Sequence, residues 1–260
     1  MYFIVITGPA GSGKTQLTHT FTDWLRSHEL DVAVVNLDPA SEYVPYSPDV
    51  DVRDYITTHE VMKKYNLGPN GALLVSIDLL INYVKDIKRE IEDLKPNYVL
   101  IDTPGQLEIF AYRRSGPLVL QNIIGDNKAV SIFLIDSYFA QQPSGLISML
   151  LLALSTSMRL KLPQIVVVSK SDLLSQEAME RVLNWIEDPG SIVADMLKER
   201  DLVIPEEIVY EIPRLGVLAM GDILFISSVT WEGIDELYAS IQRILAGGED
   251  YLTEEPSGRL

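Results

Sequence analysis

The stretch GPAGSGKT, residues Gly8 to Thr15, decides the fold of this chain. It follows the apolar run Tyr2–Thr7, which is typical of a buried strand, and it opens a pattern typical of a helix. It matches G-x-x-x-x-G-K-[ST], in which glycines let backbone N–H groups surround phosphate oxygens. Lys14 then reaches the β- and γ-phosphates, Thr15 offers its hydroxyl to Mg²⁺, and the helix N-terminus adds a favourable dipole. The residues predicted to hold the phosphates are Gly8, Gly11, Ser12, Gly13, Lys14 and Thr15.

Strand-like and helix-like segments alternate along the chain. Six short runs rich in Val and Ile predict strands: Tyr2–Thr7, Val32–Leu37, Tyr98–Ile101, Val130–Ile135, Ile165–Val168 and Ile223–Ile226. Helical patterns lie between them: Lys14–His28, Val52–Tyr65, Leu73–Leu94, Gly145–Leu160, Gln176–Glu187 and Ile234–Leu245. Nearly continuous apolar strands indicate a sheet buried on both faces. The alternation predicts an α/β fold with a mostly parallel six-stranded sheet flanked by helices.

The domain organisation is simple. Residues 1–246 read as a single domain, because no linker or internal repeat interrupts the alternation. Residues 173–221 fit the alternation less well and are interpreted as a helical insertion. Residues 247–260 are polar and acidic, which predicts a flexible tail.

Composition excludes several functional classes. The net charge is −16, which argues against direct nucleic-acid binding through phosphate contacts. There is no cysteine, so thiol catalysis and cysteine metal sites are excluded. The longest apolar run, Gly145–Leu154, is shorter than a membrane span needs. The N-terminus lacks the basic residues and cleavage site of a signal peptide, and a cytoplasmic protein without a membrane contact is predicted.

A second motif, VLIDTPGQ, ends at Gln106 and places an aspartate at the end of a buried strand. Asp102 suits the carboxylate that holds Mg²⁺, directly or through water. Gly105 can donate its backbone N–H to a γ-phosphate, because no side chain blocks the approach. Gln106 stands where an amide can orient an attacking water, although a plain strand followed by a Pro-Gly turn is an equal alternative for it.

The segment NLDPASE, residues Asn36 to Glu42, repeats this arrangement after the second strand. Asp38 can bind Mg²⁺ through water or polarise the nucleophile. An Asx-Pro turn without chemistry is the alternative, since such turns are common after strands. The functional interpretation is favoured, and the sequence leaves open whether Asp38 or Gln106 positions the water.

The residues after two further strands are predicted to recognise the base of the nucleotide. Asp172, in SKSD, can accept hydrogen bonds from N1–H and the exocyclic amine of guanine, a donor pair that adenine lacks. The aliphatic part of Lys170 can lie along the base. Ser227 and Ser228, in ISSVT, can supply backbone donors to the guanine carbonyl. Ligands of open α/β sheets bind outside the carboxyl ends of the strands, where all these segments fall.

The stretch LGPNG, with Gly68, Pro69 and Asn70, lies between two helical patterns. The glycine, proline and asparagine residues alone favour a plain turn. The motifs contain no arginine that could contact the phosphates as an arginine finger. Arg53 is interpreted as a solvated surface residue. Asn70 is therefore a candidate to supply a polar group to a γ-phosphate, held by the stiff loop.

Together these motifs resemble those of a P-loop NTPase, and more closely those of a GPN-loop GTPase, over nearly the whole chain. The residues that carry the resemblance are GPAGSGKT, NLDPASE, LGPNG, DTPGQLE, SKSD and SS. It implies a homodimer in which the Gly-Pro-Asn loop of one subunit enters the active site of the other. Two departures are Pro9-Ala10, where many dimerising relatives carry a lysine, and Ser169, where the guanine motif commonly starts with Asn or Thr.

The resemblance implies a Mg²⁺-dependent GTPase that converts GTP to GDP and phosphate. It also implies a switch in the assembly of a protein complex, linked to RNA polymerase in the family, with a protein client. A nucleotide-dependent scaffold with little hydrolysis is the first alternative. A P-loop nucleotide kinase ranks third, because the only arginine cluster is Arg113-Arg114, too little for a phosphate lid.

Overall fold

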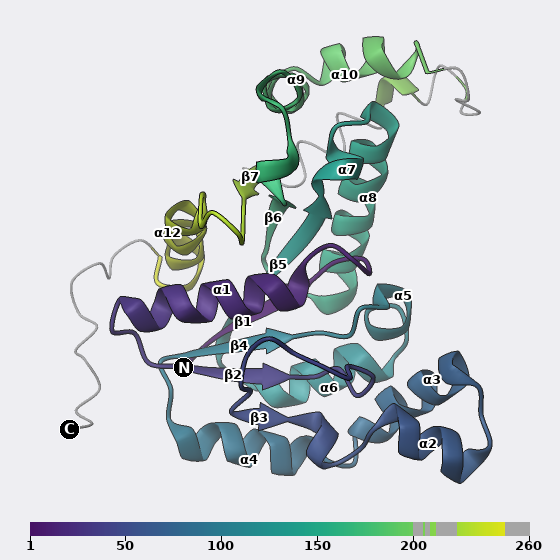
Figure 1. Cartoon of the computed structure of the whole chain (residues 1–260), viewed down its shortest axis with the longest axis vertical. Helices are drawn as coiled ribbons and strands as arrows, with labels where there is room; N and C mark the ends of the chain where they lie inside the picture. Colours follow the sequence, from purple (N-terminus) through teal and green to yellow (C-terminus); the bar gives the residue numbers. More distant parts are fainter. Residues whose placement is uncertain (200–204, 206–208, 212–222, 248–260) are drawn as a thin grey trace.

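A computed structural model describes residues 1–199, 205, 209–211 and 223–247. Its centre is one parallel sheet of seven strands in the order β3-β2-β4-β1-β5-β6-β7 (Figure 1). The strands are β1 (Tyr2–Thr7), β2 (Val32–Asn36), β3 (Val50–Asp51), β4 (Tyr98–Asp102), β5 (Lys128–Asp136), β6 (Gln164–Ser169) and β7 (Ile223–Ile226). All six predicted strands are confirmed. The seventh, β3, has only two residues and was missed, because so short a segment has no apolar periodicity.

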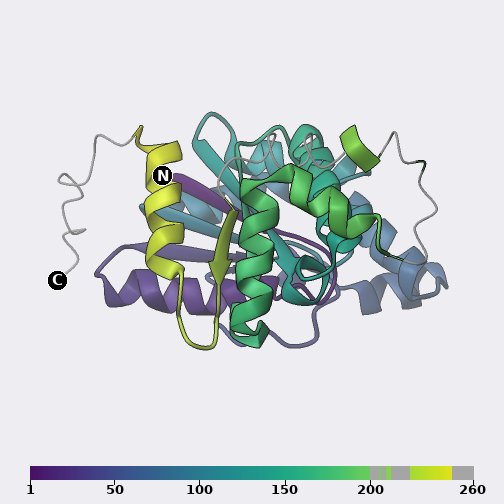
Figure 2. The same ribbon diagram turned by 90° about the horizontal axis from the view of Figure 1, so that it is seen from above.

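Helices cover both faces of the sheet. The helices on one face are α1 (Lys14–Ser27) and α12 (Ile234–Leu245), and Figure 2 shows α12 from above. The helices that pack on the other face include α3 (Pro69–Leu80), α4 (Val84–Leu94), α6 (Ser115–Ile124) and α8 (Pro143–Leu160). This two-sided cover explains why the strands are apolar along their whole length.

Two predicted helices are each divided. The pattern over 52–65 forms a short 3-10 turn, η1 (Val52–Asp54), and then α2 (Thr58–Tyr65), which starts at a capping box made by Thr57 and Glu60. The pattern over 73–94 forms α3 and α4, joined by a turn. No glycine or proline marks that second break, so it could not be predicted from the residues there.

The remaining described helices are short or lie at the edge of the fold. They are α5 (Leu107–Phe110), α7 (Ser137–Ala140), α9 (Gln176–Glu187), α10 (Pro189–Met196) and the 3-10 turn η2 (Ser171–Leu173). Helices α9 and α10 fall within the predicted insertion and pack on each other through Trp185 and Ile192. The rest of that insertion and nearly all of the predicted tail lie outside the described residues.

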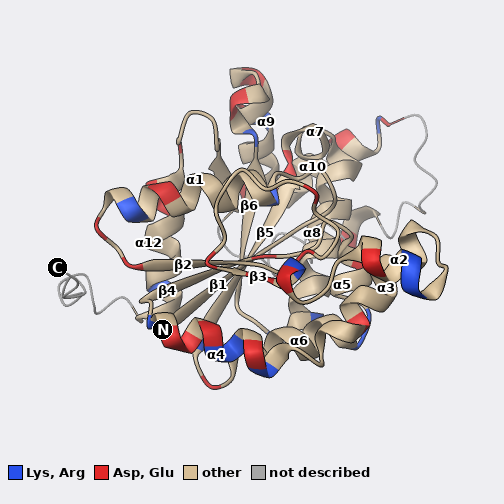
Figure 3. Cartoon of the chain, turned by 60° about the horizontal axis from the view of Figure 1, so that its bottom comes forward, with Lys and Arg blue, Asp and Glu red and all other residues tan. Residues whose placement is uncertain are grey.

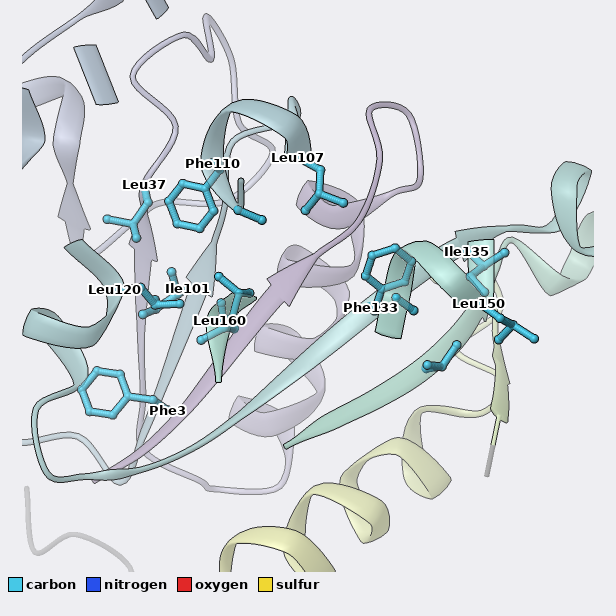
Figure 4. Close-up of a cluster of buried hydrophobic side chains, with 14 of the residues drawn as sticks. Phe3, Leu37, Ile101, Leu107, Phe110, Leu120, Phe133, Ile135, Leu150 and Leu160 are labelled. Atoms are coloured by element: carbon cyan, nitrogen blue, oxygen red, sulfur yellow. The ribbon is translucent and has the colours of Figure 1, made fainter. Parts of the chain in front are cut away.

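The larger core cluster joins the sheet to its helices. Figure 4 shows Phe3 of β1, Phe133 of β5 and Leu150 of α8 among its members, each at most 1% exposed.

On the solvent side, acidic and basic residues are interspersed along α4 (Figure 3). The helix is strongly amphipathic, with Val84, Ile87 and Ile91 buried.

Helix α8 is longer than its apolar run. It has 18 residues and a mean hydropathy of 1.2, so its length and composition alone would permit it to cross a membrane. The helix is longer than the apolar run Gly145–Leu154 from which the sequence was judged too short to span a membrane. A third of the helix is buried against the sheet, and core helices meet the same criterion.

Candidate active site

The phosphate loop closes tightly on itself. Gly8 has φ +145°, and a methyl group there would lie 2.8 Å from the carbonyl oxygen of Leu134 and from Oγ of Ser12. Only glycine fits this position. The Nζ of Lys14 is buried and donates to the carbonyl oxygens of Gly8 at 2.9 Å and Pro9 at 2.8 Å. Burial lowers the pKa of Lys14, while the nearby carboxylates of Asp102 and Asp38 raise it.

A cavity of about 490 Å³ opens beside this loop, and we call it the phosphate cavity. Its lining residues are Ala10, Gly11, Gly13, Lys14, Thr15, Gln16, Asp38, Tyr43, Pro45, Thr103 and Gly105. The sequence had predicted six of these as site residues, from three separate motifs. Parallel strands bring them together, because all three motifs follow the carboxyl ends of β1, β2 and β4.

Asp102 lies at the end of β4 and is 2% exposed. Its Oδ2 accepts a hydrogen bond of 2.8 Å from the hydroxyl of Tyr46. Burial raises the pKa of Asp102 to about 6, against the opposing effects of Tyr46, Thr15 and the Lys14 ammonium. Its Oδ1 is buried and accepts no hydrogen bond from any described residue.

These groups fit a magnesium ion. Mg²⁺ usually takes one or two carboxylates, several waters and substrate phosphates rather than a cage of protein ligands. The buried Oδ1 of Asp102 has no hydrogen-bond partner among the described residues and could bind the ion. Thr15 and Asp38 line the phosphate cavity. Among the described residues, no three His, Cys, Asp or Glu side chains form a metal cluster.

Asp38 follows β2 and turns its carboxylate toward Gly105. Its Oδ1 accepts from the backbone N–H of Ala40 at 2.9 Å. Burial raises the pKa of Asp38, while hydrogen bonds from the backbone N–H groups of Ala40 and Gly105 lower it. Asp38 and Gly105, which was predicted to bind a γ-phosphate, both line the phosphate cavity.

A second cavity, of about 620 Å³, lies beside the phosphate cavity, and we call it the side cavity. Its lining residues are Pro39, Ala40, Ser41, Glu42, Arg53, Thr57, Thr58, His59, Met62, Pro69, Asn70, Leu73 and Gln106. The two candidates Gln106 and Asn70 therefore line the side cavity, whereas Asp38 and Gly105 line the phosphate cavity. The neighbours Asp38-Pro39 and Gly105-Gln106 contribute to both cavities and separate them.

The Gly-Pro-Asn segment starts a helix. Gly68 is the N-cap of α3 and Pro69 is its first residue, where proline's fixed φ is favourable. The left-handed residue of the preceding turn is Asn66, not Asn70. Gly68 itself has φ −72°, and an added methyl group would meet no described atom within 4 Å. Among the described residues, neither backbone geometry nor packing accounts for a glycine at this position.

The predicted base reader lies at the far end of the same sheet edge. Asp172 is exposed, in η2, and its Oδ1 accepts a hydrogen bond of 2.6 Å from the hydroxyl of the buried Ser227. The Oγ of Ser227 in turn accepts from the backbone N–H groups of Val229 and Thr230. Ser228 is held by its carbonyl oxygen, which accepts from Thr20 at 2.9 Å.

Two hydrogen bonds join the base-reading segment to the phosphate loop. The Oγ of Ser169 donates to the carbonyl oxygen of Ser12 at 2.8 Å. Lys170, in a left-handed conformation, donates to the carbonyl oxygen of Gly11 at 2.8 Å and to Oδ2 of Asp136 at 2.6 Å. The structure thus joins the base-reading segment directly to the phosphate loop.

Sequence reasoning missed some of the residues that shape this site. Tyr46 was not considered, because one tyrosine in a proline-rich loop carries no signal of a contact with Asp102. Asn36 and Asp51 were missed for the same reason. Arg53, interpreted as a solvated surface residue, is only a quarter exposed and pairs with Asp51.

Comparisons with known proteins agree with these observations. The model of a family described as "conserved hypothetical ATP binding protein" matches residues 6–247. The chain is 30% identical to GPN-loop GTPase 1 of Saccharomyces cerevisiae, over 97% of this chain and 68% of that one. It is 33% identical to a GPN-loop GTPase of Pyrococcus abyssi, over 90% of this chain and 93% of that one.

A solved structure matches as well. The crystal structure of the Pyrococcus abyssi GTPase in its apo form has a TM-score of 0.82 and 31% identity, over 94% of this chain and 97% of that one. Some relatives are longer. GPN-loop GTPase 1 of Dictyostelium discoideum is 29% identical over 95% of this chain, which spans 62% of that protein's length.

Proposed function

Because the chain belongs to the GPN-loop GTPase family, we propose that it binds GTP with Mg²⁺ and hydrolyses it to GDP and phosphate. One observation carries the proposal: Lys14 and Asp38 line the phosphate cavity, the charge of the buried Asp102 acts on Lys14, and Asp172 lies at the same sheet edge. The description of the matching family names ATP. The carboxylate of Asp172 nevertheless suits guanine, because it can accept hydrogen bonds from two N–H donors of guanine that adenine lacks.

The chain's own residues would act by position and charge. Lys14 and the N–H of Gly105 would stabilise negative charge on the γ-phosphate. Asp38, which lines the same cavity, would orient the water. As the new oxygen–phosphorus bond forms, the bond to GDP breaks and the water's proton ends on the released phosphate. Thr15, Asp38 and Asp102 would hold Mg²⁺, which neutralises the phosphate charge when bound.

Single-turnover hydrolysis of GTP tests this activity and separates it from a scaffold. We expect wild-type protein to hydrolyse bound GTP and Asp38→Ala to bind it but hydrolyse it at least about 100-fold more slowly. Arg89→Ala is the matched control, because Arg89 pairs with Asp86 on the exposed surface of α4. Tight GTP binding with no turnover in wild-type protein would overturn the hydrolase and favour the scaffold.

We also propose that the protein is a homodimer and that Asn70 acts on the partner's γ-phosphate. Three observations support this. Gly68, Pro69 and Asn70 are all exposed. Nothing within the described chain requires a glycine at position 68. Asn70 lines the side cavity rather than the phosphate cavity of its own chain. A loop with these properties suits close approach by a second molecule.

Mixed dimers test the trans contact. Asn70→Ala and Lys14→Ala homodimers should each be inactive. In a mixed dimer, the Asn70→Ala subunit keeps Lys14 and receives an intact Asn70 from its partner, so one site is complete. If subunits pair at random and sites are independent, roughly a quarter of wild-type activity returns. Differentially tagged mixed dimers as inactive as either parent would instead favour a contact in cis with Gln106.

Gly68→Ser separates this role from a structural one. Serine is a good N-cap, so the free energy of unfolding should be unchanged or slightly higher. If the loop approaches a partner subunit closely, the added hydroxymethyl group should nevertheless reduce hydrolysis. A fully active Gly68→Ser protein would argue for a plain helix start.

The cellular role is proposed on resemblance alone. We propose a cytoplasmic switch that helps to assemble a protein complex linked to RNA polymerase. Capture of protein partners by a GTP-bound, hydrolysis-deficient Asp38→Ala protein tests this. Partners retained with GTP and released with GDP would support a switch, and identical capture in both states would contradict it.

A further inference from the structure

The edge strand β3 connects to the loop that carries Asp38. In the sheet register, Asn36 at the end of β2 lies between Asp51 of β3 and Asp102 of β4. Asn36 is fully buried. Its Nδ2 donates to Oδ1 of Asp51 at 3.0 Å and to Oγ of Ser41 at 3.2 Å, and its Oδ1 accepts from the backbone N–H of Asp38 at 3.1 Å. Asn36 therefore ties the first residue of the loop to the edge strand.

Arg53 ties the other end of the loop to the same strand. Its Nε lies 3.0 Å from both carboxylate oxygens of Asp51, and its Nη1 donates to the carbonyl oxygen of Ser41 at 3.1 Å. Burial raises the pKa of Asp51, but the hydrogen bonds from Arg53 outweigh this and hold it below its usual value. The ion pair is largely shielded, with side-chain exposures of 25% and 12%.

The loop between these two ties is closed by its own hydrogen bonds. The Oγ of Ser41 donates to the carbonyl oxygen of Asp38 at 3.0 Å, and the N–H of Ala40 donates to Oδ1 of Asp38 at 2.9 Å. Since both ends are fixed, the direction of the Asp38 carboxylate depends on where Arg53 and Asn36 hold the loop. Arg53 lines the side cavity and not the phosphate cavity.

We propose that Arg53 is a positioning residue for hydrolysis, which acts by holding the Asp38 loop through Asp51 and Ser41. The inference rests on the proposed function, because it assigns Arg53 a part in that reaction. It also excludes Arg53 as a finger to its own chain's phosphates in this arrangement, since the guanidinium is committed to Asp51 and Ser41. A guanidinium suits this role because its planar fork can meet a carboxylate and a carbonyl at once.

The expected effect falls on turnover rather than on binding. Arg53→Ala should lower the single-turnover rate by about 10- to 100-fold, as loss of an orienting partner typically does. The dissociation constant for GTP should change by less than about 3-fold, because the phosphate loop and Asp172 are untouched. Arg53→Lys keeps the charge without the fork and should recover part of the rate.

A double-mutant cycle tests whether Arg53 acts through Asp38. In an Asp38→Ala background, adding Arg53→Ala should lower the residual rate no further. If Arg53→Ala lowers the rate in that background by as much as it does in wild-type protein, Arg53 does not act through Asp38. The proposal is then overturned. Arg89→Ala serves as the control for loss of an arginine paired with an aspartate.

Amide hydrogen exchange gives a readout that does not need turnover. Arg53→Ala should speed exchange of the N–H groups of Ala40 and Ser41 at an unchanged global free energy of unfolding. Unchanged exchange in this loop would overturn the proposal. Absence of turnover in wild-type protein would defeat the proposed function, whereas the exchange result decides separately whether Arg53 holds the Asp38 loop.

Discussion

Asp102→Asn should remove a pH dependence from the stability of the metal-free protein. In the folded chain, burial raises the pKa of Asp102 to about 6, against an ordinary value of 3.8. Between these values the folded protein keeps a proton that the unfolded chain has released. The free energy of unfolding therefore falls as the pH rises through this window, and the loss is complete above the folded pKa.

The size of the effect follows from the two pKa values. Between about pH 5 and pH 8, Asp102 should reduce the free energy of unfolding by about 1.4 kcal/mol. The lower limit stays above the isoelectric point, near 4.5, where solubility is least. Asparagine keeps the shape and cannot titrate, so the fall measured for wild-type protein should be smaller in the variant by this amount.

Urea unfolding at the two pH values, with a chelator and at one protein concentration, measures this difference. Other titrating groups contribute equally to both proteins and cancel in the comparison. Adding Mg²⁺ and GDP at pH 8 should stabilise wild-type protein more than the variant, because the bound cation favours the ionised carboxylate. Identical pH dependence in the two proteins would refute the assignment of a raised pKa to Asp102.

Three further predictions concern the two ends of the site. Lys14→Ala should reduce single-turnover hydrolysis by about 100-fold or more, because it removes the cation of the phosphate loop; a rate near wild type would contradict its role. Asp172→Asn should weaken GTP binding by roughly 10- to 100-fold and improve binding of xanthosine triphosphate, measured in competition; retained preference for GTP would reject Asp172 as the base reader. Gly8→Ala should lower the free energy of unfolding by about 1–3 kcal/mol in urea titrations, since its methyl group meets the Leu134 carbonyl at 2.8 Å; unchanged stability would show that the loop relaxes freely.

The sequence predicted the elements that long apolar runs define. Each of the six apolar strands forms, because a strand buried on both faces needs an apolar side chain at nearly every position. The motifs after β1, β2 and β4 then meet without further information, since parallel strands deliver their carboxyl ends to one edge. That is why Lys14, Asp38 and Asp102 could be placed together in advance.

Contacts between distant, ordinary residues could not be predicted. Tyr46 and Asp102 are far apart along the chain, and no pattern in the sequence around either residue predicts their hydrogen bond. Strand β3 is too short to show a period, so the pairing of Asp51 with Asn36 and Arg53 was also invisible. The break between α3 and α4 lacks glycine and proline, and tertiary packing decides it.

The two hydrogen bonds between the base-reading segment and the phosphate loop have a consequence for which molecules compete for the site. Through these bonds, Ser169 and Lys170 hold the two ends of the site together. A nucleotide that spans both ends gains the second contact without a new loss of translational freedom. Guanosine or pyrophosphate engages one end only and forgoes that gain. The site therefore selects for molecular length as well as for the base, which keeps it available to nucleotides in the presence of their fragments.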